Sequence, residues 1–460
     1  MARRFEDTAS TPTVLPRRTS GAPHILIVGG GYVGMYTALR LQKKLRSELR
    51  RGEVQITVVD PQSYMTYQPF LPEAAAGNLS PRHVVAPLRR VLPKATVLNA
   101  RVTELNHEDR WAIVQPIAGP PKRISYDYLV MAAGSVSRTL PIPGLAEFGV
   151  GFKTIGEAIH LRNHVLAQLD IAESTEDEAI RRKALTFVFV GGGFAGVEAL
   201  AELEDMARSA TKYLRNVSVQ DMRFVLVEAA DRILPEVGPD MGRWTAEQLR
   251  GRGIDVKMKT YLNSAVGRRI ELSDGSSFEA GTLVWTAGVK AAPVLRDTDL
   301  PLDERGRVKA TEYLTVKGLV RAYTAGDNAA VPDLTTDGEF CAPNAQHAVR
   351  QSKVLADNIV ASMRGKTLKP YVHNYAGSVA GLGLYKGVAH IYGVKVKGVA
   401  AWFMHRTYHL SRVPTFNRKV KVLADWTLAL FFKRETISLG SMEQPRAEFE
   451  LASRDDARAA

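Results

Sequence analysis

The chain of 460 residues is 45% hydrophobic and 24% charged, which is ordinary for a globular protein of two or three domains. A single cysteine, Cys341, excludes an intramolecular disulfide and a redox dithiol, and it argues against a structural zinc or iron–sulfur site. The formal net charge of +13 predicts an anionic partner, for which nucleic acid, anionic lipid and an acidic protein all qualify. Neither a membrane span nor a secretory signal is predicted, so we expect the protein to stay inside the cell.

Residues 1–22 mix arginines with Ser, Thr and Pro and show no periodicity, which predicts a disordered leader. A short apolar run then begins at His24 and is followed by glycines, a helical stretch to about Arg51 and a second apolar run, 55–59. Residues 186–227 repeat the same order of strand, glycines, helix and strand. The two units therefore resemble a distant internal duplication.

Each unit has a closing strand that ends in a tight turn. The first strand runs into Ala133-Gly134, and its counterpart runs into Ala287-Gly288. No third nucleotide unit follows Gly288, so residues 323–327 and the helix from Gln346 must return to complete the first domain. We therefore expect a discontinuous first domain with the second domain inserted into it.

Gly29, Gly31 and Gly34 have G-x-G-x-x-G spacing directly between a strand and a helix. The first glycine permits the tight turn, the second lets backbone approach a pyrophosphate, and the third lets the helix pack on the strand. The helix N-terminus adds amide donors and partial positive charge. Asp60, at the end of the next strand, can accept hydrogen bonds from a ribose. These residues predict a dinucleotide site.

The second loop repeats this spacing at Gly191, Gly193 and Gly196, and Glu228 ends its second strand. A carboxylate there would bind ribose hydroxyls and repel an added 2′-phosphate, which favours NADH over NADPH. Arg232 lies four residues further on and could in principle engage a phosphate. Two such loops in one chain predict a flavin cofactor and a nicotinamide substrate, with FAD on the first loop and NADH on the second.

The order of these segments, together with residues 285–289 and 324–327, resembles that of the two-dinucleotide disulfide-reductase-like flavoproteins. The resemblance covers residues 24 to about 360. Several branches of that superfamily use cysteine pairs, which this chain lacks. The branches without catalytic cysteines therefore remain.

Further segments resemble the type II NADH dehydrogenases, which pass electrons from NADH through FAD to a membrane quinone. Residues 67–75, Tyr-Gln-Pro-Phe-Leu-Pro-Glu-Ala-Ala, are similar to a segment that follows the second strand in that family. Residues 345–351, Ala-Gln-His-Ala-Val-Arg-Gln, resemble the motif with which a family helix meets flavin and quinone. The basic, aromatic C-terminal segment resembles the family's membrane-binding element.

The resemblance implies catalytic roles for three residues. Glu198 corresponds to a glutamate between nicotinamide and flavin, although an acid near a helix start also stabilises the helix dipole. Gln346 would lie near the cofactor, whereas Arg350 replaces a glutamine that faces the quinone in the family. Arg350 could hydrogen-bond a quinone carbonyl or indicate a different acceptor. His347 is expected to be a packed or exposed helix residue rather than a proton donor.

The resemblance also implies the cofactor contacts. FAD would be held by residues of the first loop, its acidic strand end, the Ala-Gly turn and the motif at 324–327, namely Gly29, Gly31, Gly34, Asp60, Ala133, Gly134, Asp327 and Gln346. NADH would be held by the equivalent residues of the second unit, namely Gly191, Gly193, Gly196, Glu228, Ala287 and Gly288. No metal is needed for this chemistry.

Residues 399–404 and 422–432 are two apolar, aromatic stretches with basic residues beside them, among them Arg406 and Arg434. Such a pattern suits helices that lie in the plane of an anionic membrane surface. A nucleic-acid partner is not expected, because nothing resembles a known DNA or RNA module. A dimerisation or core helix pair is the alternative, and both roles can coexist.

The sequence thus predicts an α/β protein with two Rossmann-like domains and a C-terminal amphipathic segment. The expected limits are a leader (1–22), an FAD-binding domain (23–153 and 291–398), an NADH-binding domain (154–290), membrane-associating helices (399–440) and a tail (441–460). The expected activity is NADH oxidation with two-electron reduction of menaquinone or ubiquinone by a homodimer, peripheral on the cytoplasmic face of the cell membrane. The alternatives are a soluble reductase of a small electron carrier and an apoptosis-inducing-factor-like NADH sensor.

Overall fold

The computed structural model describes residues 13–14, 21–373, 377–432 and 434–438. The chain divides into two compact units, each assembled from separate parts of the sequence. Unit 1 comprises Met1–Thr66, Val85–Val136 and Val289–Tyr375. Unit 2 comprises Tyr67–Val84, Ser137–Gly288 and Ala376–Ala460.

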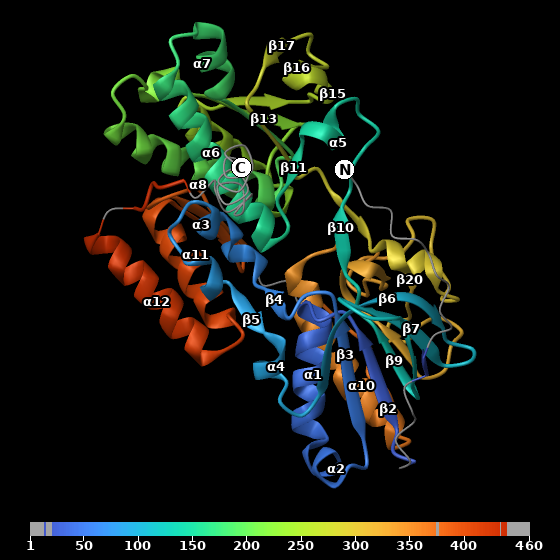
Figure 1. The fold of residues 1–460 in the computed structure, drawn as a ribbon. Coiled ribbons are helices and arrows are strands. Elements are labelled where there is room, and N and C mark those ends of the chain that lie inside the picture. The colour runs from blue at the N-terminus through green and yellow to red at the C-terminus, as the bar shows by residue number, and fades with distance from the viewer. Residues whose placement is uncertain (1–12, 15–20, 374–376, 433, 439–460) are drawn as a thin grey trace, which may run out of the picture. The chain divides into compact units, whose positions relative to one another are not determined.

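Unit 1 is built on an eight-stranded sheet in the order β1-β8-β7-β6-β3-β2-β9-β21 (Figure 1). The strands from β6 to β21 are parallel neighbours, whereas β7 pairs antiparallel with both β6 and β8. The strand bounds are β1 (Thr13–Val14), β2 (His24–Val28), β3 (Gln55–Asp60), β6 (Thr96–Asn106), β7 (Trp111–Pro116), β8 (Lys122–Ser125), β9 (Tyr128–Met131) and β21 (Ala322–Thr324).

The apolar run of β2 forms the centre of this sheet, where no residue from Ile25 to Val28 is more than 4% exposed. A parallel strand that is covered on both faces is continuously apolar, which is why this run lacks alternation. Helices α1 (Tyr32–Lys44) and α10 (Ala345–Met363) pack against each other, and Arg40 holds Asp357 through two hydrogen bonds of 2.7 Å. Shorter elements are α2 (Arg46–Arg51), β4 (Tyr64–Thr66), β5 (Val85–Pro87), α4 (Leu88–Val91), β20 (Val308–Lys309) and β22 (Ala329–Ala330).

Unit 2 contains a five-stranded parallel sheet in the order β11-β18-β12-β13-β14. Its strands are β11 (Val150–Gly151), β12 (Thr186–Val190), β13 (Arg223–Glu228), β14 (Asp255–Met258) and β18 (Thr282–Trp285). A small antiparallel sheet consists of β15 (Leu262–Ser264), β16 (Arg269–Leu272) and β17 (Ser277–Glu279). The helices before the C-terminal part are α3 (Leu71–Ala75), α5 (Leu145–Phe148), α6 (Ile155–Ser174), α7 (Glu178–Ala184), α8 (Phe194–Ala210) and α9 (Pro239–Arg250).

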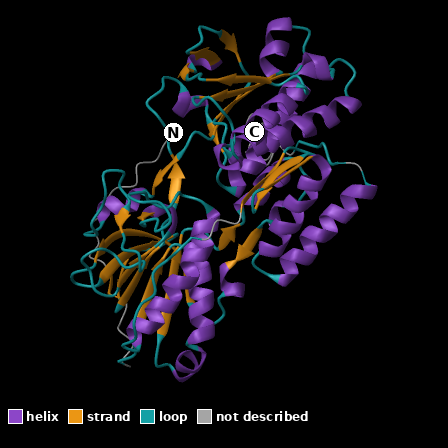
Figure 2. Ribbon diagram, turned by 180° about the vertical axis from the view of Figure 1, so that it is seen from behind, coloured by secondary structure: helices purple, strands orange, loops and turns teal. Residues whose placement is uncertain are grey.

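The C-terminal part of unit 2 is an antiparallel sheet followed by two helices, which are red in Figure 1 and are also seen from behind in Figure 2. The elements are β23 (Gly377–Gly381), β24 (Gly387–Ile391), β25 (Val394–Lys397), α11 (Gly398–Arg412) and α12 (Phe416–Phe431). Helix α11 packs on β23 and β24 and also contacts α12. Among the described residues, no helix is long and apolar enough to cross a membrane.

The predicted α/β fold with two dinucleotide units is confirmed, since each unit contains a set of parallel strands with a strand, a glycine loop and a helix in sequence. The amphipathic character of the C-terminal segment stays a prediction. Strand β21 returns after the second unit to pair with β9, as expected for a discontinuous first domain. The expected domain limits stay predictions. Most of the expected leader and the tail from residue 441 lie outside the described residues, although Thr13–Val14 within the leader pairs with β8.

Candidate functional site

The first glycine loop joins β2 to α1 by close backbone contacts. A methyl group on Gly29, whose φ is +104°, would lie 2.2 Å from the carbonyl oxygen of Ala132. A methyl group on Gly34 would lie 1.8 Å from the carbonyl oxygen of Gly29. Gly31 differs, because nothing lies within 4 Å of the same position there. The first and third glycines therefore leave no room for a side chain, and these two positions form the tight base of the loop. The second glycine, Gly31, is open, as backbone recognition of a pyrophosphate requires.

Asp60, at the end of β3, is anchored to this loop. Its Oδ2 accepts a hydrogen bond from the Gly30 amide and its Oδ1 from the Gln62 amide, each at 2.6 Å. Burial raises the pKa of Asp60, while the two amide hydrogen bonds oppose that rise. The carboxylate thus has a fixed place beside the loop, where it can accept bonds from ribose hydroxyls.

The turn after β9 lies against the turn after β21. Gly134 has a φ of +69°, and its amide donates to Asn328 Oδ1 at 3.0 Å. Ser135 Oγ donates to Asp327 Oδ2 at 2.5 Å. The structure therefore brings Ala133, Gly134 and Asp327 together at one edge of unit 1. Asn328 was not predicted, although it directly follows Asp327.

Gln346 and Arg350 are half-buried residues in the first turns of α10, whose first turn is capped by Asn344 through a 2.9 Å bond from the His347 amide. His347 is a packed residue with Nδ1 3.0 Å from the Tyr371 hydroxyl, and burial lowers its pKa to about 4. A neutral imidazole is therefore expected at physiological pH.

Two contacts of α10 were not foreseen from the sequence. The Arg350 guanidinium lies 3.1 Å from Nδ1 of His373. Gln351, which is 1% exposed, accepts a 2.7 Å hydrogen bond from the Gly326 amide. Gln351 thereby ties α10 to the turn that contains Asp327, and its place in the 345–351 motif was the available signal.

The second glycine loop repeats the geometry of the first. A methyl group on Gly191, whose φ is +114°, would lie 2.6 Å from Thr286 Oγ1, and one on Gly196 would lie 1.9 Å from the Gly191 carbonyl oxygen. Nothing lies within 4 Å of the same position on Gly193. The second loop therefore has the same tight base and the same open position as the first.

Glu228 is the counterpart of Asp60. One carboxylate oxygen accepts a short hydrogen bond from the Gly192 amide, and the other accepts from the Ala230 amide at 2.7 Å. Thr286 Oγ1 donates to the Val190 carbonyl at 2.9 Å, so the turn with Ala287 and Gly288 lies beside the loop. The predicted NADH residues of unit 2 are thus brought together.

Glu198 lies in the first turns of α8 and is only 8% exposed. Its Oε1 accepts a 2.8 Å hydrogen bond from the Gly381 amide and lies 3.2 Å from Nε2 of His405. The sequence indicated no partner for this carboxylate. Both partners belong to the C-terminal part of unit 2.

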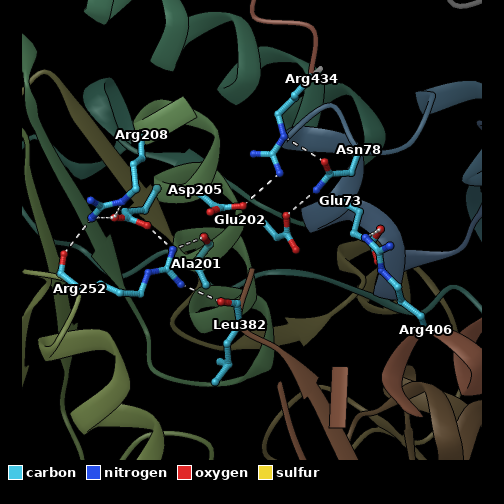
Figure 3. Close-up of polar contacts among 11 residues, drawn as sticks. Glu73, Asn78, Ala201, Glu202, Asp205, Arg208, Arg252, Leu382, Arg406 and Arg434 are labelled. Carbon is cyan, nitrogen blue, oxygen red and sulfur yellow. Dashed lines mark hydrogen bonds and ion pairs between the residues drawn. The ribbon is translucent and has the colours of Figure 1, made fainter. Parts of the chain in front are cut away.

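A buried group of charges joins Arg406 of α11 and Arg434, which follows α12, to the rest of unit 2 (Figure 3). Glu73 Oε2 accepts hydrogen bonds from Trp426 Nε1 at 2.6 Å and from an Arg406 guanidinium nitrogen at 3.1 Å. The Arg406 guanidinium also lies over the rings of Trp402, at 4.1 Å, and Trp426, at 4.8 Å. Glu73 and Arg406 are therefore a buried ion pair enclosed by aromatic rings.

A second part of the same group surrounds Glu202, which accepts a 2.8 Å hydrogen bond from Asn78 Nδ2. Arg434 donates to Asn78 Oδ1 at 3.0 Å and to Asp205 Oδ2 at 3.2 Å (Figure 3). Burial, reinforced by the charge of Glu73, raises the pKa of Glu202 to about 7. Glu202 therefore releases its proton at a higher pH than an exposed glutamate does.

These contacts correct one expectation about the C-terminal segment. Arg406 and Arg434 were expected among the basic residues beside a lipid-facing apolar surface. Their side chains are only 9% exposed, and each is paired with a carboxylate of unit 2. The reason is that helical periodicity identifies the apolar face of a helix. It does not show whether the basic residues beside that face meet carboxylates of another segment.

The family described as pyridine nucleotide-disulphide oxidoreductase matches residues 23–352. The type II NADH:quinone oxidoreductase Ndh of Mycobacterium tuberculosis is 29% identical over 92% of this chain and 90% of that protein. The demethylphylloquinone reductase NdbB of Synechocystis is 27% identical over 89% of this chain and 96% of that protein. The resemblance to type II NADH dehydrogenases is confirmed by these relatives.

The fold is also shared with a solved structure, that of NDH2 from Plasmodium falciparum in complex with NADH. The TM-score is 0.83 at 18% identity, and the match covers 90% of this chain and 99% of that one. The sulfide:quinone oxidoreductase of Aquifex aeolicus is more distant, with a TM-score of 0.67 at 16% identity over 90% of this chain and 96% of that one. Since the family match spans both glycine loops and the turns that accompany them, the chain belongs to the pyridine nucleotide-disulphide oxidoreductase family.

Proposed function

We propose that this protein oxidises NADH through bound FAD and reduces a membrane quinone. One relative is named a type II NADH:quinone oxidoreductase and another a demethylphylloquinone reductase. The observation that carries the proposal is the pair of glycine loops. Each loop has a tight base, an open second glycine and a carboxylate anchored beside it. Two such sites in one chain suit one dinucleotide that stays bound and one that is exchanged.

FAD fits the residues of unit 1. Gly31 leaves room for the pyrophosphate, and Asp60 would accept hydrogen bonds from the ribose hydroxyls. Gly134 and Asp327 would hold the part of the cofactor that lies beyond the pyrophosphate. When bound, FAD accepts a hydride from NADH and passes two electrons to a quinone, chemistry that no side chain supplies. The protein's task is to bind and orient both partners.

In unit 2, Gly193 would face the pyrophosphate of NADH and Glu228 its adenosine ribose. Glu198 would lie near the nicotinamide, where a carboxylate favours the positive charge that the ring gains as it loses a hydride. On α10, Gln346 would lie near the flavin and Arg350 would contact the quinone. The Arg350 guanidinium can donate to a quinone carbonyl and stabilise charge on the reduced product.

Membrane association would use the exposed apolar side chains of α11 and α12. Phe403 of α11 and Phe416, Leu423, Leu430 and Phe431 of α12 are each more than half exposed. The α12 residues recur at helical spacing, and Lys421 on the same helix is also exposed. Such a surface suits an anionic lipid bilayer. The cytoplasmic face and a homodimer remain our expectations.

The decisive test measures NADH oxidation by the FAD-bound protein with menaquinone and ubiquinone analogues, with and without anionic liposomes. We expect quinone-dependent turnover that rises with the liposomes, because both the quinone and the α12 surface partition into lipid. A variant with Leu423→Ser and Phe431→Ser should lose liposome sedimentation and the liposome enhancement. It should keep the turnover seen without lipid.

The alternatives give different results in the same assay. A soluble reductase would reduce a small electron-carrier protein rapidly and no quinone, with or without lipid. An NADH-sensing flavoprotein would turn over slowly with every acceptor. Either outcome would contradict the proposal that a quinone is the electron acceptor.

Glu228→Ser is expected to narrow the preference for NADH over NADPH. Removing the carboxylate relieves repulsion of the 2′-phosphate and also removes the acceptor for the NADH ribose. We expect the ratio of the two kcat/KM values to fall about tenfold or more, which corresponds to roughly 1.4 kcal/mol. Glu271→Ser, an exposed residue of β16, is the matched control and should leave the ratio unchanged. An unchanged ratio in Glu228→Ser would remove Glu228 from the selectivity argument.

A further inference from the structure

The side chain of His405 reaches from α11 to Glu198 on α8. The residue is 4% exposed, and its Nε2 lies 3.2 Å from Glu198 Oε1. The same oxygen accepts the amide hydrogen bond of Gly381 in β23 at 2.8 Å. Glu198 is therefore held at two points, and His405 is the only one of the two that can carry charge.

The ring of His405 has little freedom. A methyl group on Gly381 would lie 3.4 Å from Cε1 of His405, so the ring packs directly against the backbone of β23. A methyl group on Gly387 would lie 2.7 Å from the Trp402 amide nitrogen, which shows that α11 is in close contact with β24. The imidazole is thus fixed by the packing of α11, and its orientation does not depend on the ion pair alone.

The charged groups around His405 favour its protonated form. Burial alone would lower the pKa of His405, but the contact with Glu198 and the charges of Glu73 and Glu202 outweigh burial and raise it. His409, one turn later on α11, has its ring 4.5 Å from that of His405. Burial and the neighbouring His405 lower the pKa of His409, whose Nδ1 lies 3.1 Å from the Tyr67 hydroxyl.

Arg406, the remaining cation on this stretch of α11, is paired with Glu73. Of the two adjacent histidines, His405 is thus the one whose pKa is raised, so it keeps its proton to a higher pH than His409 does. Its partner Glu198 is almost completely buried, and the protonated imidazole is the charged group in direct contact with that carboxylate.

We propose that His405 is a positioning residue for the NADH half of the reaction, which holds the Glu198 carboxylate in a fixed orientation. This inference rests on the proposed function, in which Glu198 lies near the nicotinamide. When NADH gives up its hydride to FAD, the nicotinamide ring gains one positive charge, and a fixed carboxylate nearby stabilises that charge. Without His405, the Glu198 carboxylate keeps the hydrogen bond from the Gly381 amide but loses its charged partner, so its orientation is no longer fixed at two points.

The test follows flavin reduction by NADH in the FAD-bound enzyme, without any quinone, as a function of pH. The wild-type rate should fall as the pH rises through the raised pKa of His405, because the neutral imidazole no longer pairs with the Glu198 carboxylate. In His405→Gln, which keeps a hydrogen-bond donor but does not titrate, the rate should be about tenfold lower at neutral pH and should lack this pH-dependent step. The KM for NADH should change less than the rate. His409→Gln is the matched control and should keep the wild-type profile.

The outcomes separate this inference from the proposed function. If NADH does not reduce the flavin of the wild-type enzyme, the proposed function fails. If the wild-type flavin is reduced and His405→Gln is slower by the same factor at every pH, the role of His405 is structural and the inference is overturned. Should His405→Gln not retain FAD, an NMR titration of the histidines provides the second measurement. Glu198→Gln should lower the pKa of His405, and an unchanged His405 pKa would contradict the coupling.

Discussion

The Gly34→Ala variant should be produced without bound FAD, because its methyl group has no room. The added carbon would lie 1.8 Å from the Gly29 carbonyl oxygen and 3.2 Å from the Ile27 side chain. Helix α1 would have to move away from β2, which distorts the turn that receives the pyrophosphate. Overpacking of this kind costs about 1–3 kcal/mol or more. Flavin absorbance of the purified protein, before and after added FAD, is the measurement.

Matched variants separate steric damage from loss of the ligand. Gly31→Ala places its methyl group in open space, so the protein should fold but bind FAD less tightly. In the second loop, Gly193→Ala should also fold and keep FAD, because its added methyl group meets nothing within 4 Å. It should raise the KM for NADH, because that methyl group would face the pyrophosphate. Retention of wild-type FAD content in Gly34→Ala would show that the tight base of the loop is not required.

Replacing Glu73 with glutamine should destabilise unit 2 by about 3–5 kcal/mol, the usual cost of leaving one member of a buried ion pair without its partner. The Arg406 guanidinium would stay enclosed between Trp402 and Trp426 without its ion-pair partner. Those two tryptophans are within the affected region, so tryptophan fluorescence during denaturant unfolding is a suitable measurement. Each transition must be fitted separately in a chain of two units.

Glu53→Gln is the control for this change, since Glu53 pairs with Arg51 and both side chains are more than half exposed. Exposed pairs contribute about 0–1 kcal/mol, so this variant should unfold almost as the wild type does. Equal effects of Glu73→Gln and Glu53→Gln would contradict the view that the Glu73–Arg406 pair stabilises the packing of α11 and α12.

Both glycine loops were predictable because every determinant is local. A strand, three glycines at fixed spacing and a helix occupy one short stretch, and the acid at the end of the next strand follows from parallel pairing. The return of β21 to the first sheet was predictable for a related reason, because no other element of the sequence could close unit 1. The motif at 345–351 likewise predicts that Gln346 and Arg350 share one helix, and both lie on α10.

The partners of the buried polar side chains were not predictable. Glu73 and Arg406 are 333 positions apart, and nothing in either segment points to the other. Arg406 and Arg434 have the sequence features of a basic membrane flank, yet both are paired inside unit 2. The contact between Glu198 and His405 is equally invisible in the sequence, because it depends on how α11 packs against β23.

The sequence by itself therefore determined the two dinucleotide units and the cofactor pair, and it predicted which residues would contact the cofactors. Those features depend on short-range backbone geometry, which the spacing of glycines and apolar runs specifies directly. Only the tertiary structure decided which charges are buried and which partner each one has, since burial and pairing arise where distant segments meet. For that reason the equivalence of Asp60 and Glu228 could be anticipated, whereas the control of Glu198 by His405 could not.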